Sequence, residues 1–233
     1  MPTKIIKYSQ RLGDVLRCLP ACKYLADQGH QVLFDCFEQY HGVFDLVSYA
    51  KPLNKIPYDA ELIDLEIWPL KYGDFLKSKK PWHDFVYSHP EIKGAKRTEI
   101  VLDLLDERPA EGLPEKYHLI APFGISQSHK HNPLEIIQMA AKELGKDNIT
   151  VLCPPEVRIE GLKTYTAPTI EQLAKAVRGA DEFWAINSSP IILASAVRHG
   201  KESKFWGQKE PHEQDNVFWF EGLFRMDWHR GWF

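Results

Sequence analysis

Segments typical of β-strands alternate with segments typical of α-helices along this chain of 233 residues, and the alternation occurs twice. In the first half, predicted strands at Lys4–Tyr8 and Gln31–Cys36 flank a predicted helix at Val15–Gln28, where apolar residues recur at helical spacing and Gly29 follows as a stop. A strand–helix–strand unit of about thirty residues joins parallel strands by a right-handed crossover. The first half is therefore expected to form a parallel sheet covered by helices.

The second half repeats this order with different residues. Its predicted strands are Tyr117–Pro122, Ile149–Cys153, Leu162–Ala167 and Glu182–Ile186, and its predicted helices are Pro133–Leu144, Ile170–Arg178 and Ile191–Val197. Pro133 suits a first helical turn and Thr169 suits an N-cap. Two such halves predict an α/β protein made of two Rossmann-like units.

The middle of the chain is less regular and sets the domain boundaries. Strands are expected at Asp45–Tyr49 and Glu61–Trp68, and a helix at Glu99–Leu105. The polar segment 108–114 contains two prolines and a glycine, which is typical of a linker. We therefore predict an N-terminal domain at 1–112, a C-terminal domain at 113–204 and an aromatic-rich tail at 205–233. The rings of the tail are expected to pack against both halves, and base stacking is the alternative.

Charge and composition exclude several classes of protein. The net charge of −3 creates no global field that demands nucleic acid or anionic lipid. A basic stretch at 77–80 and 93–97 is expected to be a solvated loop, with phosphate contact as the alternative. No apolar run approaches the roughly 18–20 residues of a membrane span, and the polar N-terminus predicts a cytoplasmic protein. The four cysteines are expected to be free thiols.

The loop after the first strand carries the first candidate site. Gly13 permits close approach of the backbone, and Arg11 and Asp14 flank it. Asp14 lies at the start of the predicted helix, where a carboxylate could act as a helix cap or as a general base for a hydroxyl. The loop is not a dinucleotide fingerprint, because it has no G-x-G-x-x-G pattern.

Two loops of the second half are suited to phosphate. The loop 122–133 offers backbone, hydroxyl and ammonium donors, at Gly124, Ser126, Ser128 and Lys130. Asn187, Ser188 and Ser189 precede an apolar helix, whose N-terminus favours an anion, although simple helix capping explains them nearly as well. His129 and His131 form a pair with no apparent third ligand, so no metal site is expected. Together the two loops favour a diphosphate ligand.

These loops resemble the heptosyltransferase-like glycosyltransferases of family 9. The segment RLGDVLRCLPACKYL is similar to the family's opening G-D-V-x-x-x-L-P-A motif, whose Asp, taken as the catalytic base, matches Asp14. APFGISQSHKHNPLE is similar to a strand–glycine–Lys–Trp–Pro element, in which Lys130 matches the donor-phosphate lysine. ADEFWAINSSPIILASAV is similar to the element that binds donor sugar and diphosphate. Here Asn132 replaces the family's Trp, and Asn187, Ser189 and Ile192 replace its Asp, Gly and His.

The resemblance implies a GT-B fold, with two Rossmann-like domains, an active site in the cleft between them and an acceptor side in the N-terminal domain. It implies an inverting, metal-independent glycosyltransferase with no cofactor, which uses a nucleotide-diphosphate sugar. Asp14 would be the base, and Arg11 and Gly13 would lie at the acceptor or cleft side. The donor would be bound by Gly124, Ser126, Ser128, Lys130, Asn187, Ser188 and Ser189.

Two questions stay open at this point. The acceptor is a lipopolysaccharide-type glycan or a hydroxymethylated DNA base, and the protein is a monomer or a dimer. Because Asn187 and Ile192 depart from the family pattern, the alternative function is a catalytically degenerate protein of the same fold that binds a nucleotide or nucleotide sugar. An NAD-linked or phosphoryl-transfer enzyme lacks its own motifs here.

Overall fold

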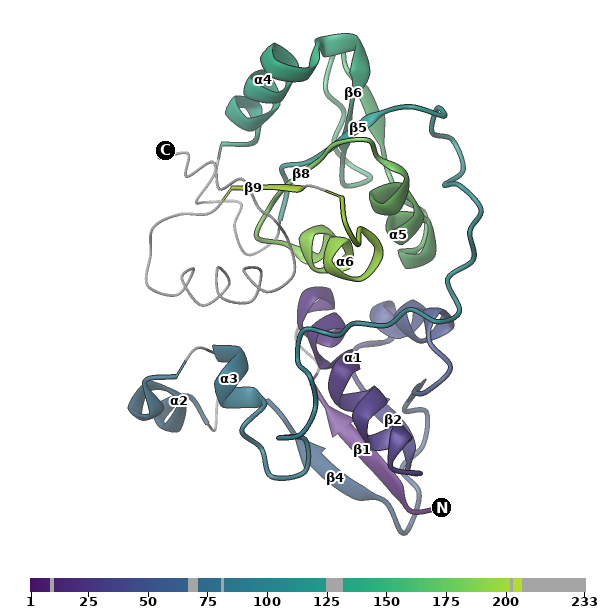
Figure 1. Cartoon of the computed structure of the whole chain (residues 1–233), viewed down its shortest axis with the longest axis vertical. Helices are drawn as coiled ribbons and strands as arrows, with labels where there is room; N and C mark the ends of the chain where they lie inside the picture. Colours follow the sequence, from purple (N-terminus) through teal and green to yellow (C-terminus); the bar gives the residue numbers. More distant parts are fainter. Residues whose placement is uncertain (9–10, 67–70, 81, 125–131, 202, 207–233) are drawn as a thin grey trace. The chain divides into compact units, whose positions relative to one another are not determined.

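A computed structural model of the chain describes residues 1–8, 11–66, 71–80, 82–124, 132–201 and 203–206. The chain forms two compact units that divide between Leu105 and Asp106 (Figure 1). This division lies a few residues before the boundary expected at 112. The aromatic-rich tail predicted at 205–233 lies almost entirely outside the described residues.

The first unit is built on a parallel sheet with the strand order β3–β2–β1–β4. Its strands are β1 (Thr3–Lys7), β2 (Gln31–Asp35), β3 (Lys51–Pro52) and β4 (Glu61–Asp64). Helix α1 (Leu12–Asp27) connects β1 to β2 and buries Val15, Leu16 and Leu19. The 3₁₀ helix η1 (Glu38–Leu46) follows β2, and the helices α2 (Tyr72–Ser78) and α3 (Trp82–Val86) follow β4. The predicted strand–helix–strand unit is confirmed.

Two expectations for the middle of the chain are wrong. Asp45–Tyr49 is not a strand, because the 3₁₀ helix continues to Leu46 and the following residues are irregular. The segment 99–105 is not a helix. Its backbone is held from outside instead: the Leu104 N–H donates to the Leu46 carbonyl at 3.1 Å, and the Tyr49 hydroxyl donates to the Val101 carbonyl at 2.7 Å. The apolar residues of this segment have the spacing of a helix, which explains the wrong expectation, but the segment is irregular and is hydrogen-bonded to residues 46 and 49.

The second unit is a five-stranded sheet with the order β7–β6–β5–β8–β9, in which every pair is parallel. Its strands are β5 (His118–Ala121), β6 (Ile149–Leu152), β7 (Lys163–Tyr165), β8 (Phe183–Ile186) and β9 (Ser203–Trp206). Its helices are α4 (Pro133–Leu144), the short 3₁₀ helix η2 (Lys146–Asn148), α5 (Ile170–Gly179) and α6 (Ser189–Val197). The first four strands and the three α-helices confirm the predicted order. β9 was not predicted.

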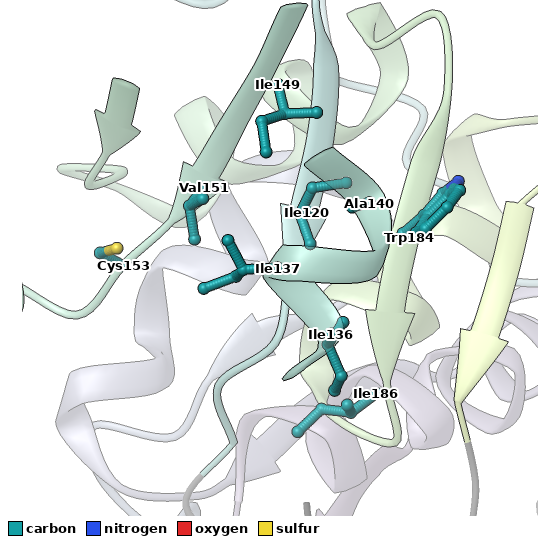
Figure 2. Packing of buried hydrophobic residues seen from close by; sticks show 9 residues of the cluster. All are labelled: Ile120, Ile136, Ile137, Ala140, Ile149, Val151, Cys153, Trp184 and Ile186. Atoms are coloured by element: carbon teal, nitrogen blue, oxygen red, sulfur yellow. The ribbon is translucent and has the colours of Figure 1, made fainter. Parts of the chain in front are cut away.

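A cluster of buried side chains joins α4 to this sheet (Figure 2). Ile136, Ile137 and Ala140 come from one face of the helix. Alternate residues of the strands face them: Ile120 from β5, Ile149 and Val151 from β6, Trp184 and Ile186 from β8, with Cys153 just beyond β6. Burying one such aliphatic side chain stabilises the fold by about 1.5–3 kcal/mol. Because β6, β5 and β8 pair in parallel, their carboxyl ends lie at one edge of the sheet that this packing stabilises.

Candidate functional site

The candidate residues lie where parallel strands end and helices begin. After β1, Arg11 is the N-cap residue of α1 and Gly13 lies in its first turn, while the loop after β8 leads through Asn187 and Ser188 into α6. Gly124 follows β5, the strand that pairs with β8. In open α/β sheets, ligands bind at this edge. The predicted residues that the structure describes therefore lie, in each unit, at the edge that such folds use for binding.

Asp14 does not cap the helix on which it lies. The N-cap residue of α1 is Arg11, whose carbonyl accepts from the N–H groups of Asp14 and Val15, both at 3.0 Å. Asp14 is an acidic residue of the first turn, and its carboxylate lies 3.9 Å from the guanidinium of Arg17. The side chain of Asp14 is 19% exposed. Asp14 is therefore not a helix cap. Its carboxylate is partly exposed to solvent and lies near the cationic side chain of Arg17.

The surroundings of Asp14 change the pKa of its carboxyl group in two opposite directions. Burial raises the pKa of its carboxyl above the ordinary value, while the charges of Arg17 and Arg11 act in the opposite direction. A carboxylate with a raised pKa accepts a proton more readily. Tyr8 and Cys18 lie close by and remain protonated, because burial raises the pKa of each well above its usual range. Of these three groups, Asp14 is the one whose ordinary pKa lies below neutral pH.

Gly124 and Ser188 are brought together although they lie far apart in the sequence. A Cβ atom added to Gly124 would lie 3.1 Å from the Ser188 Cβ and 3.2 Å from the Ile186 Cδ1. A side chain at residue 124 would therefore require Ser188 or Ile186 to shift by a few tenths of an ångström, so glycine favours the close approach of this backbone to the start of α6. The two loops that the sequence singles out for phosphate meet at these two residues.

The N-terminus of α6 has no side-chain cap. Its N-cap residue is Ser188, and the Ser188 hydroxyl donates backwards to the Ile186 carbonyl at 3.2 Å rather than accepting from the helix. Asn187 and Ser189 flank this residue and are partly exposed. Uncapped N–H groups and the helix dipole favour an anion. Ile192, which stands where the resembled family has His, is a buried residue of α6.

Several predicted site residues lie outside the described residues. They are Ser126, Ser128 and Lys130, together with His129 and His131. Asn132, which replaces the family's Trp, has a structural role: its side chain accepts from the Leu134 N–H at 3.1 Å and caps α4.

Sequence reasoning missed Arg17. It occupies a position that the resembled motif leaves unspecified, yet it is the residue whose guanidinium faces Asp14. The sequence does contain one indication of its role. Arg17 follows Asp14 by three residues, a spacing that places opposite charges on one face of a helix. Among the described residues, no group of three or more His, Cys, Asp or Glu side chains is arranged to hold a metal ion. None of the described helices combines the length and the hydropathy that a membrane crossing requires.

Comparison with known proteins agrees with this architecture. No family model and no curated protein matches the sequence. Among solved structures, the glycosyltransferase TibC of enterotoxigenic Escherichia coli, described as iron-containing and dodecameric, is 17% identical with a TM-score of 0.59 over 88% of this chain. The chain spans 57% of the length of TibC. A family 9 glycosyltransferase from Veillonella parvula has a TM-score of 0.63 at 12% identity, covering 90% of this chain and 81% of that one.

The heptosyltransferase WaaC of E. coli, solved with ADP-2-deoxy-2-fluoro heptose, also has a similar structure. It is 14% identical, with a TM-score of 0.59 and 89% of each chain covered. The chain therefore has the α/β fold of GT-B-like glycosyltransferases, with heptosyltransferases and family 9 enzymes as its structural neighbours. At these identities the likeness defines the fold, and the activity has to be argued from the site.

Proposed function

We propose that this chain is a glycosyltransferase that moves a sugar from a nucleotide-diphosphate sugar to an acceptor hydroxyl, with inversion and without a metal ion. The observation that carries the proposal is the placement of Asp14: an acidic residue that does not cap its helix, has a raised pKa and follows β1 in this fold. The acceptor is a glycan or a hydroxymethylated DNA base. A cytoplasmic location, an acceptor side at 1–112 and a donor side at 113–204 belong to the same proposal.

The mechanism is a single displacement. The Asp14 carboxylate accepts the proton of the acceptor hydroxyl as the hydroxyl oxygen forms a bond to the anomeric carbon. The bond between that carbon and the diphosphate oxygen breaks, and the nucleoside diphosphate leaves with the electron pair. The uncapped N-terminus of α6, together with Ser188, Ser189 and the Gly124 backbone, would stabilise the charge that develops on the leaving group. Lys130 would add an ammonium donor.

A specific observation supports a second candidate, a binding protein without transfer activity. Asn187 has no negative charge where the resembled family has Asp, and Ile192 is part of the core where that family has His. Such a protein would bind a nucleotide or nucleotide sugar and leave it intact.

Binding is tested by measuring the thermal stability of the chain with ADP-, GDP-, UDP- and CMP-sugars. A ligand present at 100 times its Kd stabilises a protein by about 2.7 kcal/mol, which is readily detected. Stabilisation by one of these donors supports both candidates. No shift with any of them contradicts both.

Catalysis is tested with Asp14→Asn, which keeps the shape of the side chain and removes the base. We expect donor binding to stay within about twofold and turnover to fall by about 100-fold or more, the scale of lost general-base catalysis. Asp27→Asn is the matched control, because Asp27 is an exposed carboxylate on the same helix, paired with Lys23. Equal turnover in Asp14→Asn and Asp27→Asn would remove Asp14 from the mechanism.

A further inference from the structure

Arg17 lies one helical turn after Asp14 and is almost completely enclosed. Its side chain is 11% exposed, and its Nη1 atom lies 3.9 Å from the Asp14 Oδ1. The backbone at this turn is held as well, because the Tyr87 hydroxyl donates to the Arg17 carbonyl at 2.5 Å. The position of Arg17 along α1 is therefore fixed by the fold.

A buried guanidinium constrains the carboxylate beside it. Arginine does not lose its proton in proteins, and an enclosed charge is costly unless an opposite charge is near. Among the described residues, the charged or titratable groups that act on Asp14 or Arg17 include Tyr8 after β1, Arg11 before α1 and Cys18 on α1, and Glu66 after β4 acts on Tyr8. Tyr8 and Cys18 are neutral because they are buried, and Arg11 has the same charge as Arg17. Asp14 supplies the negative charge nearest along the helix.

We propose that Arg17 is a positioning residue that keeps the Asp14 carboxylate deprotonated and holds it at a fixed place on the first turn of α1. Its catalytic meaning rests on the proposed function, since a general base must be deprotonated before each reaction. Burial alone would favour the protonated acid, which cannot accept a proton. Arg17 opposes this effect, and the Asp14 side chain beside it stays 19% exposed.

The ionisation of Asp14 can be followed without any substrate, by NMR titration of ¹³C-labelled aspartate carboxyl groups, with Asp14→Asn assigning the signal. In Arg17→Met we expect the pKa of Asp14 to rise by about one unit or more, as follows from loss of an opposite charge within about 4–6 Å. Arg17→Lys keeps the charge and should restore most of the wild-type titration. Lys23→Met is the matched control, because it removes an exposed cation from the same helix and should leave Asp14 unchanged. An Asp14 titration that is the same in Arg17→Met and Lys23→Met would overturn the proposal.

A second measurement covers the case in which Arg17→Met does not fold. Asp14→Asn keeps the volume of the side chain, and in this variant the Nε–Hε resonance of Arg17 should shift and exchange faster with solvent. An unchanged resonance would also overturn the proposal. If transfer activity is found, the acid limb of its pH–rate profile should move to higher pH in Arg17→Met. The NMR result stands even if the chain transfers no sugar, so failure of the two proposals can be told apart.

Discussion

Gly124 shows how the lack of a side chain allows two loops of the candidate site to approach each other. Its Cβ position lies within 3.2 Å of atoms of both Ser188 and Ile186, which is closer than ordinary van der Waals contact. We expect Gly124→Ala to displace the start of α6 and to weaken binding of the best nucleotide sugar about tenfold, or about 1.4 kcal/mol. The cost in folding stability should be about 1 kcal/mol. Calorimetric Kd values and urea midpoints measure the two effects separately.

Gly73 offers a matched control for this substitution. It lies in α2, and a Cβ atom added there meets nothing within 4 Å. Gly73→Ala should leave the Kd unchanged and slightly increase stability, because alanine is the better helix former. If Gly124→Ala binds the donor as tightly as Gly73→Ala does, the backbone at residue 124 has no part in the site.

The residues differ in how well the sequence alone predicts them. Asp14 could be found because a motif and a strand–helix junction coincide at it, and Ser188 because it precedes an apolar helix. Arg17 could not, since its importance comes from burial and from a distance to Asp14 that only the folded helix defines. The close approach of Gly124 to Ser188 is likewise a product of strand pairing between β5 and β8.

At the scale of elements, Arg198 joins the end of α6 to three neighbours. Its guanidinium donates to the carbonyls of Val177 at 3.0 Å and Ala180 at 2.6 Å, and to the Ser203 hydroxyl at 3.1 Å, and it lies over the ring of Phe183. Burial lowers the pKa of Arg198 to about 10, so the group stays charged at neutral pH. It therefore ties the C-terminal end of α5 to α6, β8 and β9.

Removal of this side chain should destabilise the second unit. Arg198→Met leaves buried carbonyl groups without their donor, and we expect the free energy of unfolding to fall by roughly 3 kcal/mol. Arg158→Met is the control, because Arg158 is an exposed arginine that bonds to carbonyls of Pro155 and Val157 in its own loop. The control should change stability by less than about 0.5 kcal/mol. Similar denaturation curves for the two variants would show that Arg198 does not hold these elements together.

Elements with strong local signals agree with their sequence predictions. Pro133–Leu144 is a helix with the predicted bounds, and Thr169 caps α5 by accepting from the Gln172 N–H at 3.1 Å. The failures occur where tertiary contacts decide the conformation. β9 is short and carries Lys204, and it becomes a strand because β8 leaves an edge open for pairing. The helix α2 is only seven residues long and buries none of them, so its few apolar residues form too short a pattern to predict it.

At the scale of the molecule, the sequence predicts two α/β halves, with the first ending at residue 112, and the two compact units divide between Leu105 and Asp106. Composition alone indicates a linker at 108–114. Residues 106–111 are held along α5: the Lys175 Nζ lies 2.8 Å from the Asp106 Oδ1, and the Glu111 N–H donates to the Gln172 Oε1 at 2.8 Å. A contact between charged side chains far apart in sequence leaves no local pattern, so composition alone could not place this boundary.

The attachment of residues 106–111 to α5 depends on ionised side chains. Hydrogen bonds from Arg108 and Lys175 lower the pKa of the Asp106 carboxyl well below its usual range. Because this pKa is depressed in the folded chain, the contact is fully present above the ordinary carboxyl value and is lost as the pH falls through the lowered one. At neutral pH the segment is therefore expected to stay bound to α5.

Cleavage by a glutamyl endopeptidase measures this binding directly, because Glu107 and Glu111 both lie in the held segment. A protease cuts a segment in its released state, so weaker holding raises the rate of cleavage. In Lys175→Met, which removes a cation that contacts both Asp106 and Glu171, we expect cleavage after these two residues to become several-fold faster at pH 7.5. Lys201→Met is the matched control, since Lys201 is exposed and bonds to the Arg178 carbonyl in the same unit. Intact-mass analysis of the two fragments follows the rate, and equal rates in Lys175→Met and Lys201→Met would show that the ion pairs of α5 do not hold the linker.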